Sequence, residues 1–579
     1  MPPNGIPSYR APFMGTVHMV STGHYLASMA GYRILEQGGN AIDAGVAAGI
    51  TLNVVVSEQT SFGGVAPIMV YRADTGQVRT ISGIGRWPAS TDLDEFNNEH
   101  KGAIPPGIVR TVTPSSCDAW LTALQQFGTM TFEQVSEPAI ELADRGFPCS
   151  VRMARMINRQ QDFMGQFPST VEVYMPQGRP PNPGEILRLK DLASTFRKLV
   201  DEERANTHKG REGAIQAARD LFYKGELAET MVRFCQAMGG KLTLEDMAEF
   251  HVGVDEPQVG SYKDYTLYSC GPWCQGPAFI EMMHILEGYD LTSMGLNSSQ
   301  YLHTILEAMK LSFSDRHEYY GDPDFEDVPM AGLLSKSYAE DRRAALDQKK
   351  AWPEMPPAGD PWPHQGGIRS KAPLVSAVPN YARREIDTSY CAVVDRWGNA
   401  FSAATSDGPH MSPVVKGTGI ALSARGGQSW IDPEHPARLG PRRRPRLTPQ
   451  AAIIFKDGQL YMPFGTPGED MQLQAMVQMF LNLAEFGLDP QQATEEPRVR
   501  SDSFPLTYHP HVYKPGEAVL EGRIDKEAAH GLEEMGHKVN WTDDWTIDNG
   551  AISAIVVDRE RGILIGGADP RRANYAIGW

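Results

Sequence analysis

The chain has 579 residues, of which 41% are hydrophobic, and a formal net charge of −17. A chain of this size and apolar content buries a large core, as two lobes or as one layered domain, so disorder is not expected. The acidic balance argues against non-specific binding to nucleic acid or to an anionic membrane, because both need a basic excess. No run of about 18 apolar residues occurs and the amino terminus has no apolar signal region, so we expect a soluble, cytoplasmic protein.

In chain order, the first part of the sequence predicts a strand at 17–22, helices at 24–36 and 41–56, and a hairpin within 61–83. Residues 115–211 have a mostly helical pattern with a Pro-rich loop at 175–185, and a further helix is expected at 219–238. Strand and loop follow at 261–275, and two helices at 276–320. Residues 352–380 are rich in Pro and Gly with little periodicity. After residue 388 strands predominate, at 388–395, 399–406, 417–423, 451–455, 460–464, 552–557 and 563–567, with one helix at 470–486.

The six cysteines are too sparse for a disulfide framework, and Cys270 and Cys274 lack a second pair of ligands at metal-binding spacing, so reduced thiols are expected. The charged residues of SDRHEYYGDPDF, at 314–325, are expected to brace a helix end, with metal binding as the lesser alternative. The arginines between 438 and 446 could suggest a polyanion site. No aromatic residues interleave with them and the chain is acidic, so no nucleic-acid role is expected.

Several segments, in the right order along nearly the whole chain, carry a resemblance to a known family. They include HYLASMAGYRILEQGGNAIDAGVAAGITLNVV, EAMKLSFSDRHEYYGDPDF, TSYCAVVDRWGNAFSAATSDG, FGTPGEDMQLQAMVQMFLN and GGADPRRANYAIGW. The sequence resembles the gamma-glutamyltranspeptidase family, and its departures from the transpeptidases resemble the amidohydrolase and acylase-like branch. The resemblance implies an α+β fold, a four-layer αββα sandwich of the amino-terminal-nucleophile hydrolase type.

The family is made as one precursor that cuts itself before a Thr, which is Thr388 here, so the junction would be Asp387–Thr388. The large-subunit segment would be 1–387 and the small-subunit segment 388–579, both within one αββα domain. Two such heterodimers could associate. A Thr hydroxyl needs a base, and a freed α-amino group, with a reference pKa of about 7.7 to 8.0, supplies one on the same residue. This chemistry requires no metal or organic cofactor.

The resemblance also implies the other site residues. Gly468 and Glu469 stand where the family has the Gly-Gly pair that supplies oxyanion donors. Glu469 would be strained if that position takes a positive φ. Ser406 is the hydroxyl that supports the nucleophile. The remaining candidates, for substrate binding, are Arg86, Arg425, Thr405 and Thr448.

The segment ARGGQSW, at 424–430, has no Asp or Glu where true transpeptidases bind the substrate's α-amino group. This absence, together with the available arginines, favours hydrolysis of an amide whose acyl group carries a carboxylate and no α-ammonium, such as a dicarboxylic monoamide. One alternative is a γ-glutamyl hydrolase or transferase acting on glutathione-like substrates. A second is an unprocessed, non-catalytic binding homologue.

Overall fold

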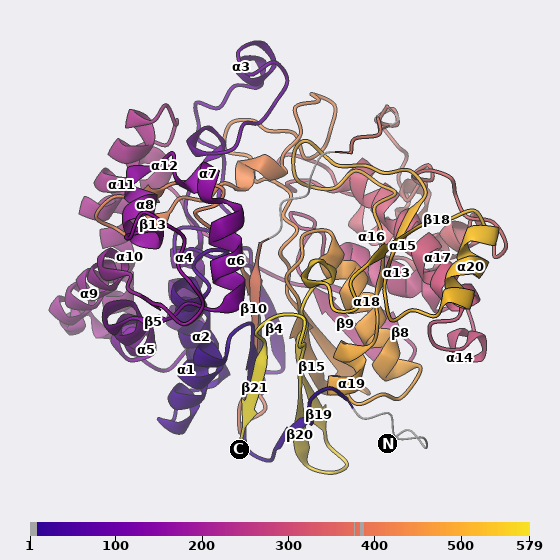
Figure 1. Cartoon of the computed structure of the whole chain (residues 1–579), viewed down its shortest axis with the longest axis horizontal. Helices are drawn as coiled ribbons and strands as arrows, with labels where there is room; N and C mark the ends of the chain where they lie inside the picture. Colours follow the sequence, from indigo (N-terminus) through magenta and orange to yellow (C-terminus); the bar gives the residue numbers. More distant parts are fainter. Residues whose placement is uncertain (1–7, 376, 382–386) are drawn as a thin grey trace.

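The computed structural model describes residues 8–375, 377–381 and 387–579, and it is built around two seven-stranded antiparallel sheets (Figure 1). The first sheet has the order β21 (Tyr575–Gly578), β2 (Met19–Thr22), β10 (Ser389–Val394), β11 (Ala400–Thr405), β3 (Ile68–Arg72), β4 (Gln77–Ile81), β7 (Val254–Asp255). The second has the order β1 (Phe13–Gly15), β20 (Ile563–Ala568), β19 (Ser553–Asp558), β15 (Gln459–Gly465), β14 (Ala452–Lys456), β9 (Tyr265–Ser269), β8 (Gln258–Tyr262). Segments 1–387 and 388–579 therefore both supply strands to each sheet.

Helices cover the outer face of each sheet. Those beside the first sheet, at the left of Figure 1, are α1 (Tyr25–Glu36), α2 (Ala41–Val55), α4 (Ser116–Phe127), α5 (Phe132–Arg145), α6 (Val151–Arg159), α7 (Gln161–Met164), α8 (Pro168–Tyr174), α9 (Lys190–Ala205), α10 (Gly210–Lys224), α11 (Glu226–Ala237) and α12 (Leu244–Ala248), with α3 (Leu93–Asn98) above them. Those beside the second are α13 (Pro277–Leu286), α14 (Leu291–Met294), α15 (Ser299–Tyr319), α16 (Met330–Leu333), α17 (Lys336–Ala344), α18 (Met471–Ala484), α19 (Pro490–Glu495) and α20 (Lys526–Glu534).

Short strands complete the structure: β5 (Phe147–Pro148) with β6 (Ile186–Leu187), β12 (Val414–Val415) with β13 (Ile420–Ala421), and β16 (Val499–Ser501) with β17 (Glu517–Glu521) and β18 (Lys538–Thr542).

The strand that follows Thr388 shows why the architecture has four layers. Every residue of β10 is buried, and its side chains alternate between two apolar clusters. Cys391 and Val393 pack into the cluster shared with the helices beside the first sheet, whereas Tyr390 and Ala392 pack into the cluster between the two sheets. A strand covered on both faces reads as a continuous apolar run, as this one does. The predicted α+β, αββα sandwich is confirmed.

Helix α2 lies unusually close to the first sheet because of its small residues. All of its residues are buried, and Asn40 and Asp43 close its first turn in a capping box. A Cβ added to Gly45 would lie 2.2 Å from the ring of Phe401 on β11, so only glycine permits this approach. The helix is thereby fixed against the two strands that carry Thr388 and Ser406.

The predicted elements differ from the structure in several places. The two helices expected at 276–320 are three, α13, α14 and α15, and the sequence did not predict α19, α20 or β16, β17 and β18. The helix expected at 219–238 is broken at Gly225, which separates α10 from α11. The strand expected at 417–423 is reduced to β13, which pairs only with β12. All six cysteines are buried and unpaired, as expected. Among the described residues, no helix combines the length and apolar character needed to cross a bilayer.

Candidate active site

Thr388 lies immediately before β10, and its hydroxyl is held between two polar side chains. The Thr388 hydroxyl donates to Oδ1 of Asp387 at 3.0 Å and lies 2.7 Å from the hydroxyl of Ser406. The antiparallel register of β10 and β11, which pairs Ser389 with Thr405, brings Ser406 opposite Thr388. The structure therefore joins the two hydroxyl residues that the sequence predicted, although 18 positions separate them.

Only one assignment of donors and acceptors satisfies the hydrogen bonds around Thr388. Arg425 donates from Nη2 to the hydroxyl oxygen of Ser406 and to Oδ2 of Asp387. Thr388 has a single hydroxyl proton, which it gives to Asp387, so Ser406 must donate its own proton to Thr388. A directed set of hydrogen bonds thus runs from Arg425 through Ser406 and Thr388 to the carboxylate of Asp387.

The backbone at this junction is strained. Thr388 has a φ of 82° and Asp407, next to Ser406, has a φ of 79°. A β-branched residue in this region is a genuine outlier, and such conformations cost on the order of 1–3 kcal/mol each. They persist only where the surroundings hold them, here through the hydrogen bond from the Asp407 backbone N–H to Asp387 at 3.3 Å. Breaking the 387–388 bond would release the constraint on Thr388.

Arg425 is the centre of a buried charge cluster. Its side chain is 0% exposed and pairs with Asp387 and, at 3.1 Å from Nε, with Asp407. The ring of Tyr508 lies under the guanidinium at 5.3 Å. Burial raises the pKa of the Asp407 carboxyl, an effect that the charge of Arg425 opposes. The Nη1 group of Arg425 has no hydrogen-bond partner among the described residues.

Thr388 also lines a narrow hollow on its other side. This hollow has a volume of about 20 Å³, enough for about one water molecule. Two arginines reach it: the buried Arg572 donates to the carbonyl of Thr388 at 3.3 Å, and the half-buried Arg152 donates to Gln59. Both interact electrostatically with Asp387. Glu58 lies in the same wall, and burial raises the pKa of its carboxyl.

Sequence reasoning missed Glu58, Arg152, Asp407 and Arg572. The only available signals were the polar residues following α2 and the RR pair in GGADPRRANYAIGW, and neither carries a spacing that points to Thr388.

The turn at 466–470 begins α18 and reaches the hollow through Pro467. Gly468 has a φ of 128° and Glu469 a φ of 58°, so the condition under which Glu469 would be strained is met. Glu469 is 1% exposed, and its carbonyl accepts a hydrogen bond from Gln275 at 3.1 Å. Backbone N–H groups at a helix start favour negative charge, which is what an oxyanion site needs. The oxyanion role of both residues stays a prediction.

Two further predicted residues flank this centre. Thr405 accepts from Asn53 at 2.9 Å. The hydroxyl of Thr448 accepts from Gln428 at 2.8 Å, and its carbonyl shares the amide of Gln275 with Glu469. Thr448 is thereby tied to the turn at 466–470, whereas Thr405 faces α2. Their substrate-binding roles remain predictions.

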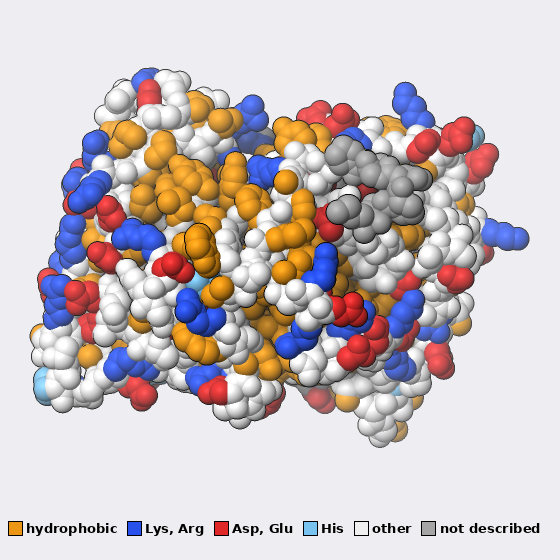
Figure 2. All heavy atoms as spheres, turned by 90° about the horizontal axis from the view of Figure 1, so that it is seen from below, with side chains coloured by type: hydrophobic (Ala, Val, Ile, Leu, Met, Phe, Trp, Pro, Cys, Tyr) orange, Lys and Arg blue, Asp and Glu red, His pale blue; other side chains and the backbone are white. Residues whose placement is uncertain are grey.

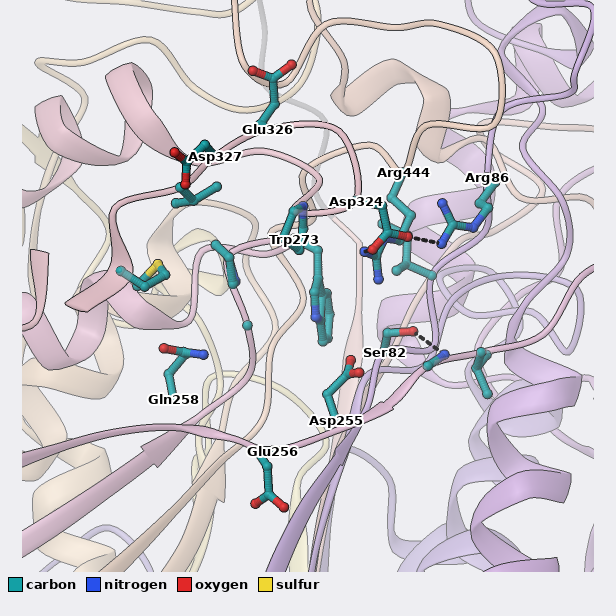
Figure 3. Close-up of a pocket in the computed structure, with 18 of the residues that line it drawn as sticks. Ser82, Arg86, Asp255, Glu256, Gln258, Trp273, Asp324, Glu326, Asp327 and Arg444 are labelled. Atoms are coloured by element: carbon teal, nitrogen blue, oxygen red, sulfur yellow. Dashed lines mark hydrogen bonds and ion pairs between the residues drawn. The ribbon is translucent and has the colours of Figure 1, made fainter. Parts of the chain in front are cut away.

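Arg86 lies elsewhere, in the wall of a larger hollow of about 470 Å³ (Figure 3). It pairs with Asp324 at 2.5 Å and with Asp322 at 3.5 Å. In Figure 3, Arg86 and Arg444 lie on one side of the hollow and the Trp273 ring between them and Gln258. Arg86 and Thr388 therefore line different hollows.

The other charged groups are largely structural. The helix-end residues expected to brace α15 do so, since Asp315 pairs with Arg342 at 2.8 Å and Asp322 with Arg444 at 2.6 Å. The face seen in Figure 2 intersperses acidic and basic side chains around hydrophobic ones, and where it is described it has no continuous basic surface.

Within the described residues, a buried trio has atoms close enough to hold a metal ion, namely His303, Glu307 and His537. The ammonium of Lys310, 2.7 Å from Glu307, already supplies positive charge there.

The chain is similar to known proteins along nearly its whole length. The family model described as gamma-glutamyltranspeptidase matches residues 27–579. The glutathione hydrolase-like YwrD proenzyme of Bacillus subtilis (strain 168) is 32% identical over 570 residues, which cover 98% of this chain and 99% of the relative. The solved structure of LmbA2991HD superposes with a TM-score of 0.91 at 32% identity and covers 99% of this chain and 100% of its own. The cephalosporin acylase from Bacillus halodurans gives 0.85 at 27% identity, with coverage of 100% and 99%.

Proposed function

The chain belongs to the gamma-glutamyltranspeptidase family as an amide hydrolase, and on that premise we propose that it cuts itself before Thr388 and then hydrolyses amides through an acyl-threonine intermediate. The observation that carries this proposal is the position of the Thr388 hydroxyl, buried at the head of β10 between Ser406 and the carboxylate of Asp387. The proposed subunits are residues 1–387 and 388–579, and two such heterodimers could associate.

In the first reaction, Oγ1 of Thr388 attacks the carbonyl carbon of Asp387. The hydroxyl proton passes to Oδ1 of Asp387, 3.0 Å away, and then to the Thr388 nitrogen as the C–N bond breaks. The product is an ester between Asp387 and Thr388, with a free α-amino group. Water then hydrolyses the ester, which leaves the Asp387 carboxyl group and the Thr388 hydroxyl. The strained φ at Thr388 favours this direction, because cleavage removes the constraint.

In later turnovers the α-amino group of Thr388 takes the hydroxyl proton, and Oγ1 attacks the carbonyl of an external amide. The amine leaves with the proton, and water hydrolyses the acyl-threonine ester to a carboxylic acid. Ser406 donates to the attacking oxygen, and the turn with Gly468 and Glu469 supplies N–H groups for the oxyanion. No step requires a metal or an organic cofactor.

The charges around Thr388 favour an acyl group that carries a carboxylate. The buried Arg425 and Arg572 and the half-buried Arg152 all interact electrostatically with Asp387, and guanidinium groups recognise carboxylates through paired hydrogen bonds. Residues 424–430 contain no Asp or Glu to bind an α-ammonium group. Arg86, as a substrate-binding residue, would have to act from the larger hollow.

A γ-glutamyl substrate is the second candidate, because a relative similar along its whole length is named a glutathione hydrolase-like proenzyme. We place the enzyme in the cytoplasm, and the six unpaired, buried cysteines suit a reducing compartment.

A denaturing gel of wild-type protein and Thr388→Ala tests the proposal. The wild type should separate into two subunits, whereas the variant should run as one band at 63.8 kDa. Two bands from Thr388→Ala would place the junction elsewhere, and one band from the wild type would favour the non-catalytic binding homologue. Anilides of a dicarboxylic acid and of γ-glutamate, with and without a dipeptide acceptor, then separate the two candidate substrates and distinguish hydrolysis from transfer.

A further inference from the structure

Asp387 carries the first acyl group that Thr388 would attack. The position of Asp387 therefore indicates which acyl groups fit beside Thr388. Its backbone carbonyl is the carbon attacked in self-cleavage, and its side-chain carboxylate stands two carbon atoms away, beyond Cα and Cβ. The acyl half of the junction is therefore a four-carbon dicarboxylic unit. This inference rests on the proposed function, in which Thr388 attacks both its own chain and external amides.

That carboxylate occupies a defined binding position. Its Oδ2 accepts from Nη2 of Arg425 and, at 3.3 Å, from the backbone N–H of Asp407. Asp387 and Arg425 are both 0% exposed. Salt bridges of this kind form only where the geometry compensates two desolvated charges, and removal of one partner is strongly unfavourable. Once cleavage frees the Asp387 end, the position calls for another carboxylate.

The guanidinium of Arg425 can donate further hydrogen bonds to such a carboxylate. Its Nη2 serves Asp387 and Ser406, and its Nε faces Asp407 at 3.1 Å. Its Nη1 is buried with no hydrogen-bond partner among the described residues. An incoming carboxylate can therefore bond to Nη1 and Nη2 together, the paired arrangement that arginine and carboxylate prefer.

We propose that the processed enzyme prefers acyl groups whose carboxylate lies two carbon atoms from the scissile carbonyl, as in succinic monoamides, with Arg425 as the carboxylate receptor. Oxamic and malonic amides bring the carboxylate too close to the attacked carbon. Glutaric and γ-glutamyl amides place it one methylene too far. A missing or extra methylene in a fitted pocket changes kcat/KM by roughly 10- to 200-fold.

The wild-type enzyme tests this chain-length preference directly. The probes are the anilides of oxamic, malonic, succinic and glutaric acids, with butyric anilide as the uncharged match of the succinic one. We expect kcat/KM for the succinic anilide to exceed that for the glutaric anilide by at least about tenfold, and to exceed that for butyric anilide by more. A glutaric or oxamic anilide hydrolysed as fast as the succinic one overturns the inference but leaves the proposed function intact.

If the protein cuts itself but hydrolyses none of the charged anilides, the carboxylate preference in the proposed function is wrong, and this inference is wrong with it. The two failures are therefore distinct.

The receptor role is tested with Arg425→Met and a matched control, Arg443→Met, whose guanidinium pairs with Glu326 at 2.9 Å. The readout is the ratio of kcat/KM for succinic anilide to that for butyric anilide, which general loss of active protein leaves unchanged. Arg425→Met should bring this ratio close to one through KM, whereas Arg443→Met should keep the wild-type ratio. An unchanged ratio in Arg425→Met rules out Arg425 as the receptor.

Arg425 also contacts Ser406, so Arg425→Met can block self-cleavage. Two substitutions of Asp387, the residue whose carboxylate Arg425 binds, therefore test the same position. Asp387→Glu moves the carboxylate one methylene away, and Asp387→Asn removes its charge. Asp387→Glu, which keeps a carboxylate to accept the Thr388 proton, should slow the appearance of subunits by about tenfold or more. Asp387→Asn also removes that proton acceptor and should slow it further. Wild-type rates in both variants would show that the Arg425 position does not select the acyl group.

Discussion

The hydroxyl of Ser406 lies 2.7 Å from the hydroxyl of Thr388 and, by the count of available protons, is the donor in that bond. The donor keeps the Thr388 oxygen oriented while its own proton goes to Asp387. The register of β10 against β11 fixes this distance, because Ser389 and Thr405 are direct partners.

Ser406→Ala should therefore slow both self-cleavage and amide hydrolysis by about 10²-fold, the lower range for one positioned proton-transfer group. The fold should persist, since β11 keeps its backbone ladder. Time courses on denaturing gels measure the first effect. Ser402→Ala is the control, because the Ser402 hydroxyl bonds Tyr390 on the same pair of strands and does not contact Thr388. Equal rates for both variants would remove Ser406 from the mechanism.

Gly468→Ala should disturb the turn at 466–470, the proposed source of oxyanion donors, through the backbone alone. An added Cβ at Gly468 would meet its nearest atom at 3.4 Å, an ordinary contact, but the φ of 128° is unfavourable for alanine. We expect slower cleavage together with a loss of stability of about 1–3 kcal/mol. Gly487→Ala, at a φ of 62° with open space around it, should reduce stability without changing the rate per folded molecule. Unimpaired cleavage in Gly468→Ala would contradict the oxyanion assignment.

Asp470→Asn should destabilise the whole protein. The Asp470 carboxylate is fully buried, pairs with Arg316, and accepts from the backbone N–H of Thr507 at 2.7 Å. Loss of one partner leaves Arg316 uncompensated, which costs about 3–5 kcal/mol in comparable buried pairs. Chemical denaturation measures this. Asp144→Asn, which weakens surface pairs with Lys190 and Arg197, should change stability little; a similar loss in both variants would argue against the buried pair as the cause.

Stability should fall as pH is lowered from about 6.5 to about 4, and His24 should contribute to that fall. Burial lowers the pKa of His24 to about 4, from the 6.5 of an exposed histidine. Between these values the unfolded chain binds a proton that the folded chain does not, so the contribution is present above pH 6.5 and lost as pH falls. The maximum slope from one such group is about 1.4 kcal/mol per pH unit.

His24→Asn isolates this contribution, because asparagine also caps helices and His24 Nδ1 accepts from the Leu26 N–H at the start of α1. Thermal unfolding across pH 4–7 should show a shallower decline for the variant. Parallel curves for the two proteins would mean that His24 does not titrate in this window; the buried His284, whose pKa burial also lowers to about 4, is the next group to replace.

Local sequence pattern was enough to predict most elements. The apolar run after Thr388 predicts a strand, and Gly38–Gly39 ends α1 where expected. Two of the errors have local causes that tertiary structure overrides. Gly225 separates two helices that periodicity alone joins, and the segment around β13 has too few partners to extend its pairing.

The sequence by itself determined the family resemblance, the layered fold and the candidates Thr388, Ser406 and Gly468, because these depend on short motifs in a fixed order. Only the tertiary structure decided which charges lie near Thr388. It brought Arg425, Arg152 and Arg572 to Asp387, and it placed Arg86 in a separate hollow with Asp324. The physical reason is that sheet register and helix packing set side-chain distances across hundreds of residues, whereas sequence pattern reports only the neighbours along one strand or one helix turn.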